Sequence, residues 1–197
     1  MNIGITEIKN LREKTGAGMM DCKEALTESN GDVEKAILVL RKKGLADIKK
    51  REGKKTSEGT IGKYFHPGNK LAALVEVNAE TDFVSKGELF HKFADDIAMH
   101  VAAVNPQWVS RDQVPQHIID REKEIMSESL VGKPPQVIEK IVEGKLNKFF
   151  KETCLMDQEY VKDSNLTITD LMGDLASKVG EKIVIKWFVR RVVGEKQ

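Results

Sequence analysis

The fold of this chain is decided by the stretch Leu71-Ala-Ala-Leu-Val-Glu-Val-Asn-Ala-Glu-Thr-Asp-Phe-Val-Ser-Lys86. Its first eight residues are short, apolar and partly β-branched, a pattern that predicts a largely buried strand. Polar residues then end the strand, and a helical pattern begins almost at once after Asp82-Phe83-Val84. A large aromatic side chain and a carboxylate therefore lie together where a strand passes into a helix.

Phe83 has two interpretations from the pattern alone. Aromatic residues at the ends of elements usually pack, so Phe83 could be the first core residue of the helix that follows. A rigid corner between a strand and a helix is also a good place to present a side chain to a partner. The first interpretation requires a buried ring and the second an exposed one.

The segments on either side of this stretch predict a β-hairpin and a helix. Residues 60–66 have a second β pattern, and the connection contains Pro67-Gly68, which fits a type II turn. Apolar residues recur every three or four positions from about Lys86 to Val104, as in an amphipathic helix. Because the hairpin and the helix each have one apolar face to bury, we expect them to pack together.

The next part of the chain predicts a helical hairpin at 111–151. Ser110-Arg-Asp-Gln113 is a capping-box pattern that we expect to open a helix ending near Val131. Gly132-Lys-Pro-Pro135 then reverses the chain, because glycine ends one helix and proline begins the next. Apolar residues line both helices, so the pair is expected to be antiparallel.

The C-terminal part predicts a short extended stretch at 154–161, a helix and a strand. Thr167 is expected to cap the helix and Gly180 to end it. Residues 183–193 form the strongest strand pattern, which we expect to pair antiparallel with the hairpin as the third strand of the sheet. Alternation places Ile183, Ile185, Trp187 and Val189 on one face, and Lys186 and Arg190 on the other.

The N-terminal 43 residues show three short helical patterns. Thr6 is expected to cap the first, which runs to about Lys14, and the second covers about 20–29. Asp32 is expected to cap the third, and Gly44 to end it. The chain as a whole therefore predicts an α+β fold: a three-helix domain at 1–43, a linker at 44–59, and a core at 60–197 with a three-stranded antiparallel sheet, packed helices and the helical hairpin.

The linker region is unusually basic. Between positions 41 and 55 the chain has eight basic residues: Arg41, Lys42, Lys43, Lys49, Lys50, Arg51, Lys54 and Lys55. Such a cluster could be a nucleic-acid surface. However, no aromatic residues are interleaved to stack on bases, and the whole chain has 32 lysines and arginines against 31 acidic residues. We therefore interpret the cluster as a solvated helix extension and a mobile linker, and expect no nucleic-acid partner.

The sequence also lacks the patterns of several protein classes. No apolar run approaches the roughly 20 residues that span a membrane, and no secretory signal is visible, so a cytoplasmic protein is expected. Cys22 and Cys154 have no CxxC partner and are expected to be reduced thiols, or else to pair across a dimer. No phosphate-binding loop, nucleophile elbow or metal-ligand spacing is present, so we expect neither an enzyme nor a bound cofactor or metal.

Two stretches resemble the elongation factor Ts family. Glu76-Val-Asn-Ala-Glu-Thr-Asp-Phe-Val84 resembles its Thr-Asp-Phe-Val signature, and Leu11-Arg-Glu-Lys-Thr-Gly-Ala-Gly-Met-Met-Asp-Cys-Lys-Glu-Ala-Leu26 resembles its N-terminal signature. Because two long matches occur in the order of the family, the signal is specific. The resemblance covers nearly the whole chain, and it makes residues 1–43 similar to a ubiquitin-associated-like domain.

The resemblance implies a function. Members of the family are guanine-nucleotide exchange factors for elongation factor Tu, so this chain is expected to bind elongation factor Tu with GDP and without nucleotide. It would promote GDP release by disturbing the magnesium and phosphate site. The matching positions imply partner-binding roles for Lys9, Arg12, Met19, Met20, Thr81, Asp82, Phe83 and Val84. From the pattern alone, one of the two methionines could instead close the small N-terminal core.

The chain also departs from the longer members of the family. Those carry two similar hairpin subdomains, whereas here the helix after Phe83 leads straight toward the helical hairpin. The resemblance to short members implies a homodimer, with the exposed face of the sheet as its contact. Two alternatives remain: a ubiquitin-associated-like adaptor, and an RNA-binding protein that uses the basic linker.

Overall fold

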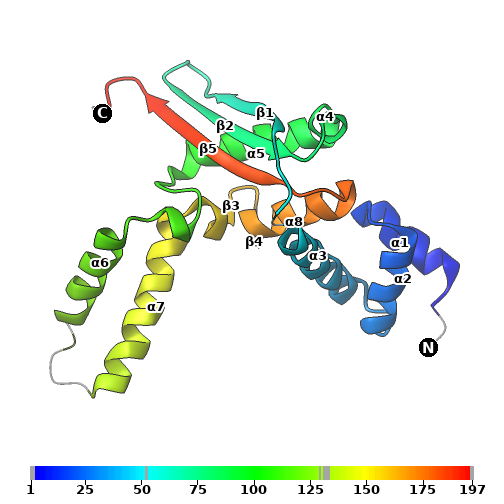
Figure 1. The fold of residues 1–197 in the computed structure, drawn as a ribbon, viewed down its shortest axis with the longest axis horizontal. Helices are drawn as coiled ribbons and strands as arrows, with labels where there is room; N and C mark the ends of the chain where they lie inside the picture. Colours follow the sequence, from blue (N-terminus) through cyan, green and yellow to red (C-terminus); the bar gives the residue numbers. More distant parts are fainter. Residues whose placement is uncertain (1–2, 52, 129, 131–133, 196–197) are drawn as a thin grey trace.

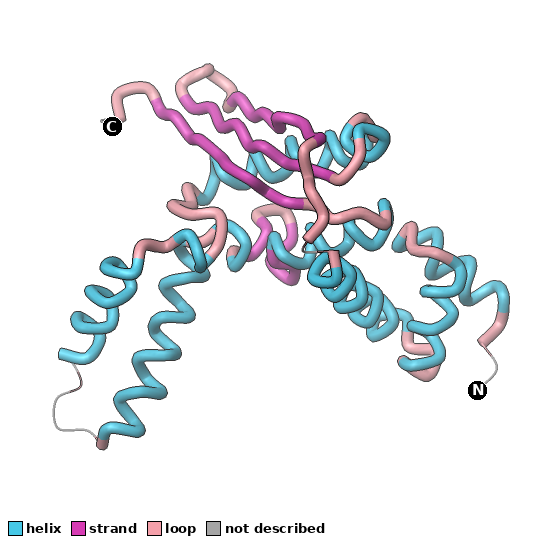
Figure 2. Tube along the Cα trace, in the orientation of Figure 1, coloured by secondary structure: helices cyan, strands magenta, loops and turns pink. Residues whose placement is uncertain are grey.

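A computed structural model describes residues 3–51, 53–128, 130 and 134–195. The sheet of β1 (Glu58–Phe65), β2 (Leu71–Ala79) and β5 (Val184–Val192) lies at the top of the view, with α5 (Glu88–Val104) behind it (Figure 1). The N-terminal helices and the hairpin of α6 (Gln116–Glu128) and α7 (Pro135–Thr153) extend in different directions, and the tube in Figure 2 shows the same branched outline. The predicted α+β class is confirmed.

The predicted hairpin and its turn are confirmed. β1 (Glu58–Phe65) pairs antiparallel with β2 (Leu71–Ala79). The carbonyl of His66 accepts a hydrogen bond of 2.9 Å from the amide of Asn69. Gly68 has a φ of 92°, which a type II turn requires at this position and which glycine adopts without strain.

The third strand, β5 (Val184–Val192), pairs antiparallel with β2 as predicted, but its two faces were assigned wrongly beyond Ile185. Val77 pairs with Ile185 and Glu76 with Trp187, so Lys186 is an extra residue in a β-bulge. The bulge reverses the alternation that follows. Trp187 is therefore exposed, Val189 pairs with Leu74 on the outer face, and Arg190 turns inward.

The opposite face of the sheet is covered by α5 (Glu88–Val104). The predicted packing of helix on hairpin is confirmed, although the helix begins at Glu88 rather than near Lys86. The inward residues of β2 and α5 join those of α8 (Ile168–Val179) in the main core, whose large members include Val75, Val77, Phe90, Ile97, Val101, Ile168 and Leu175. The guanidinium of Arg190 is anchored on the carbonyl of Ala102 in α5 at 3.1 Å.

A second, two-stranded sheet was not predicted. Residues expected to form one extended stretch contain a 3-10 turn, η2 (Leu155–Asp157), followed by β3 (Glu159–Tyr160). β3 pairs with β4 (Asp163–Thr167), which leads into α8 (Ile168–Val179). The predicted ends of α8 are confirmed: Thr167 caps it with Asp170 in a capping box, and Gly180 ends it in the left-handed conformation.

The N-terminal unit consists of α1 (Ile5–Thr15), α2 (Met19–Glu28) and α3 (Val33–Lys50). Asp32 caps α3 as predicted, by accepting a hydrogen bond from the amide of Lys35. The N-cap of α1 is Gly4 and not Thr6. The small core of this unit contains Ile8, Leu11, Ala17, Cys22, Ala25, Leu26, Ala36 and Leu40.

Gly44 does not end α3, contrary to the prediction. The helix continues to Lys50 and packs along α8, so the first part of the expected linker is helical. A Cβ atom on Gly44 would lie 2.4 Å from the carbonyl oxygen of Gly173 in α8. The glycine is therefore a close-packing residue at a helix crossing rather than a stop signal.

The predicted helical hairpin is formed by α6 (Gln116–Glu128) and α7 (Pro135–Thr153). Its first helix begins later than expected, because residues 111–113 form a 3-10 turn, η1 (Arg111–Gln113), in which the Gln113 side chain accepts a hydrogen bond from the Val109 amide. Val131, Gly132 and Lys133, part of the expected reversal, lie outside the described residues. None of the described helices is long and apolar enough to cross a membrane.

Candidate functional site

The corner after β2 is built by a one-turn helix, α4 (Asp82–Ser85). Thr81 caps it, since its hydroxyl accepts a hydrogen bond from the amide of Val84 at 3.4 Å. The carbonyl of Gly87 then accepts the hydrogen bonds that start α5, so the short helix α4 is followed almost at once by a long one. This local structure fixes the backbone on both sides of Phe83.

Phe83 points away from the protein. Its side chain is 86% exposed, whereas its neighbour Val84 is buried against the main core. The interpretation of Phe83 as a core residue is therefore wrong, and Val84 takes that place. An aromatic side chain of this size that is almost fully exposed on an ordered corner has a large apolar area available for a partner.

Asp82 lies beside Phe83 on the same short helix and forms an ion pair with Lys86, with a distance of 2.7 Å between carboxylate and ammonium. The hydrogen bond from Lys86 lowers the pKa of Asp82 and raises that of Lys86. Both side chains are mostly exposed, so the pair contributes little to stability. It leaves the Asp82 carboxylate charged and oriented next to the ring.

A shallow apolar hollow adjoins the corner. It is lined by Phe83, the exposed Leu89 at the start of α5, and Val179 at the end of α8, with Lys178 and Glu181 at its rim. The hollow and the ring together form one continuous surface. The sequence had indicated Phe83 but not Leu89, because the apolar periodicity of residues 86–104 predicts a buried face for the leucine.

The candidate residues of the N-terminal unit form a second surface. Met20 is 65% and Met19 37% exposed at the start of α2, and neither belongs to the small core of this unit. Lys9 and Arg12 are exposed on α1. In Figure 1 these helices and α4 lie on the same side of the molecule, away from the α6–α7 hairpin.

Comparisons with known proteins agree with these features. A model of the family described as "Elongation factor TS" matches residues 6–195. The chain belongs to the elongation factor Ts family. It is 51% identical to Elongation factor Ts of Fervidobacterium nodosum over 197 residues, which cover 99% of this chain and 100% of that protein. It is also 51% identical to Elongation factor Ts of Moorella thermoacetica, over 98% of this chain and 96% of that protein. As a member of this family, the chain is a translation elongation factor.

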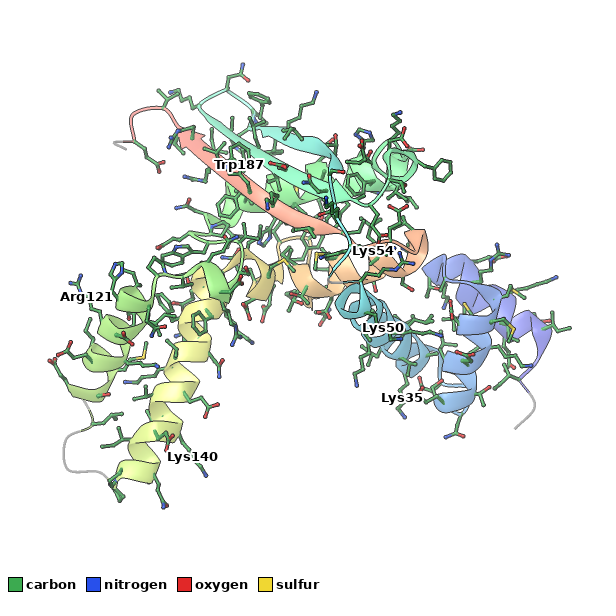
Figure 3. All side chains as sticks on the ribbon, in the orientation of Figure 1. Lys35, Lys50, Lys54, Arg121, Lys140 and Trp187 are labelled. Atoms are coloured by element: carbon green, nitrogen blue, oxygen red, sulfur yellow. The ribbon has the colours of Figure 1, made fainter. Side chains whose placement is uncertain are left out.

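In this elongation factor Ts homologue, three residues of the basic cluster bind the protein's own carboxylates. Arg41 binds Asp174 in α8 at 3.0 Å, and Arg51 binds Glu80 at 2.9 Å. Lys43 binds two carboxylates of α2, those of Asp21 and Glu24, and these hydrogen bonds raise its pKa. The interactions dock α3 on its neighbours. Figure 3 labels Lys50 and Lys54 near the end of this helix.

The two cysteines are free and completely buried, Cys22 in the N-terminal core and Cys154 beneath the helical hairpin. Burial raises the pKa of both thiols, which disfavours the reactive thiolate. Within the described residues, no three histidine, cysteine, aspartate or glutamate side chains lie close enough together to hold a metal ion.

Proposed function

We propose that this protein is the guanine-nucleotide exchange factor of elongation factor Tu: it binds elongation factor Tu with GDP and promotes release of the nucleotide. The observation that carries the proposal is the exposed ring of Phe83 on the corner of the family signature. Unlike an enzyme, such a factor needs no catalytic side chains of its own. It acts only through its differential affinity for two states of its partner.

Phe83 acts as a wedge in this proposal. The ring enters an apolar pocket of the partner near the bound magnesium ion, and Asp82 fixes the approach. Thr81 and Val84 contribute by holding the shape of the corner, since one caps the short helix and the other is buried. Disturbing the magnesium and phosphate contacts lets GDP leave.

The ring cannot supply the whole effect. Burying one phenylalanine side chain contributes about 1.5–3 kcal/mol, which is roughly one to two decades in affinity. The remaining free energy must come from other contacts, and the N-terminal surface of Lys9, Arg12, Met19 and Met20 is the proposed source. Exposed methionines suit such a surface because they adapt to the shape of a partner.

We also propose that the protein is a homodimer, which carries two copies of this site and binds two molecules of elongation factor Tu. The outer face of the sheet supports this proposal. Ile61 and Phe65 on β1 are exposed beside Leu74 on β2 and Trp187 on β5, which Figure 3 labels. Exposed apolar side chains on neighbouring strands of one face, among polar ones such as Lys63 and Glu76, are a pattern that protein interfaces share.

We further propose that the chain divides into a three-helix domain at 1–43, a linker at 44–59 and a core domain at 60–197. The helix α3 connects the first domain to the last. A cytoplasmic location is proposed because protein synthesis takes place there. We propose no nucleic-acid partner, since three of the basic residues in the cluster already bind carboxylates of the chain itself.

The test is release of fluorescently labelled GDP from elongation factor Tu as the concentration of this protein rises. We expect the release rate to increase and then saturate, and unlabelled GDP in excess to dissociate the complex, because coupling between two ligands is reciprocal. An adaptor would bind without changing the release rate. An RNA-binding protein would instead show binding to RNA that falls steeply with salt.

A further inference from the structure

Two loops bind each other directly beneath the corner that carries Phe83. The loop from β2 to α4 contains Glu80 and Thr81, and the loop from α8 to β5 contains Glu181 and Lys182. The Glu181 carboxylate accepts hydrogen bonds from the amide of Thr81 at 3.1 Å and from its hydroxyl at 2.6 Å. In the opposite direction, the Glu80 carboxylate accepts a hydrogen bond of 2.8 Å from the amide of Lys182.

Glu80 also connects this pair of loops to the N-terminal unit. Arg51, which follows α3, donates hydrogen bonds to both carboxylate oxygens of Glu80 at 2.9 and 3.0 Å. The Glu80 side chain is largely buried, so these bonds are less screened than those on an open surface. The Lys182 amide, and after it Arg51, lowers the pKa of Glu80, which keeps the acceptor charged. One carboxylate thus joins three segments of the chain.

We propose that Glu181 and Glu80 are positioning residues for the exchange reaction and that their reciprocal bonds hold the Phe83 ring ready for its partner. This inference rests on the proposed exchange function. Because the ring is almost fully exposed, it has little packing of its own to fix its direction. Its position follows from the backbone of the short helix, which the bonds to Thr81 secure. A preorganised side chain loses less conformational freedom on binding.

The chemistry of position 181 requires a carboxylate. Thr81 presents two donors, its amide and its hydroxyl, and the two oxygens of Glu181 accept one each. Glutamine has a single acceptor oxygen, and its amide group would meet the second donor with another donor. Glu181→Gln should therefore keep one of the two bonds, while Glu181→Ala should lose both.

The first arm of the test needs no partner. Three amides of the corner make local hydrogen bonds: Ser85 to Thr81, Lys86 to Asp82, and Gly87 to Val84. In Glu181→Ala we expect their hydrogen exchange to accelerate about tenfold, the effect of losing a well-formed charge-assisted bond. Glu181→Gln should be intermediate. Glu159→Ala, which removes an exposed glutamate of β3, is the matched control and should leave these amides unchanged.

The second arm measures labelled GDP release across a range of factor concentrations. For Glu181→Ala we expect the maximal rate to fall about tenfold, while the half-saturating concentration stays within about twofold because the rest of the interface is unchanged. Glu181→Gln is again intermediate, and it carries the test if the alanine variant does not fold.

The outcomes separate the inference from the function on which it rests. Unchanged amide exchange in both Glu181 variants, or an unchanged maximal rate despite faster exchange, would overturn the positioning role. A wild-type protein that does not stimulate GDP release would reject the exchange function itself, whatever the amides show. Glu80→Gln should repeat the loss, since it weakens the bonds to Lys182 and Arg51.

Discussion

At the scale of the residue, Phe83 can be tested by removing its ring. Phe83→Ala should lower the maximal rate of stimulated GDP release more than tenfold, because the exposed ring is the part of the corner that a partner can bury. The free energy of unfolding should change by less than about 0.5 kcal/mol, as for other exposed side chains. Labelled GDP release and urea unfolding measure the two quantities.

Phe83→Leu is the matched control for this prediction. Leucine keeps much of the apolar area and should retain a large part of the rate. If Phe83→Ala releases GDP as fast as the wild type does, the ring is not the wedge, and the exposed hollow beside it would have to be tested next through Leu89.

His100 provides a second prediction, on pH dependence. The ring is completely buried, with Nε2 2.9 Å from the amide oxygen of Gln158, and its Nδ1 accepts a hydrogen bond from the amide of Val161. These partners fit the neutral ring protonated at Nε2, and burial lowers the pKa of His100 below the ordinary 6.5. The unfolded chain then takes up a proton that the folded one does not, so stability falls as the pH falls below 6.5.

For one such proton, the free energy of unfolding changes by about 1.4 kcal/mol per pH unit. Urea unfolding between about pH 7.5 and pH 5 covers the relevant range and lies above the ordinary pKa values of aspartate and glutamate. His100→Gln should reduce the slope, even if it lowers stability at every pH. Equal slopes in the two proteins would assign the pH dependence to other groups.

At the scale of the element, the crossing of α3 and α8 depends on Gly44. A methyl group there would lie 2.4 Å from the carbonyl oxygen of Gly173 and 3.1 Å from Cβ of Ser177. Gly44→Ala should therefore force the helices apart and lower the free energy of unfolding by about 1–3 kcal/mol. Thermal or urea unfolding measures this change.

Gly144→Ala is the matched control, since Gly144 also lies inside a helix but nothing approaches the added methyl group within 4 Å. Alanine has the higher helix propensity, so this variant should gain up to about 1 kcal/mol. Opposite signs for the two variants are expected. A stabilising Gly44→Ala would mean that α3 does not pack against α8 beyond this residue.

The helices and strands of this chain illustrate what a sequence can predict. The hairpin and the ends of α8 were predicted because turn residues and caps act on their immediate neighbours, as Pro67-Gly68 and Thr167 do. Gly44 was misread because a glycine that ends a helix and one that permits close packing look alike in a single sequence. Only the position of α8 decides between them.

The bulge in β5 could not be predicted for a similar reason. Residues 183–189 contain apolar side chains in both phases of the alternation, so the pattern fits either face. Pairing with β2 makes Lys186 the extra residue and turns Trp187 outward. The bonds of Glu181 to Thr81 leave no local pattern either, because they join residues 100 positions apart.

At the scale of the whole molecule, the open face of the sheet is smaller than a standard protein–protein interface. Three strands of about eight residues cover roughly 14 by 26 Å. The area of this face is below the roughly 800 Å² that each partner buries in a standard interface. Association through this face alone should therefore depend on concentration. The apolar side chains at its centre, above all Trp187, should determine its strength.

Trp187→Glu tests this interface. The substitution places a second carboxylate next to Glu76, its partner across the strands, and burying two like charges side by side in an interface is costly. We expect the wild type to sediment as a dimer at micromolar concentration and the variant as a monomer. Ile125→Glu, on the exposed side of the helical hairpin, is the control and should remain dimeric.

A monomeric wild-type protein would reject the homodimer. A dimeric Trp187→Glu variant would keep the homodimer but assign its contact to another face. If the variant is monomeric, GDP release per subunit compared with the dimeric Ile125→Glu variant shows whether pairing matters for exchange.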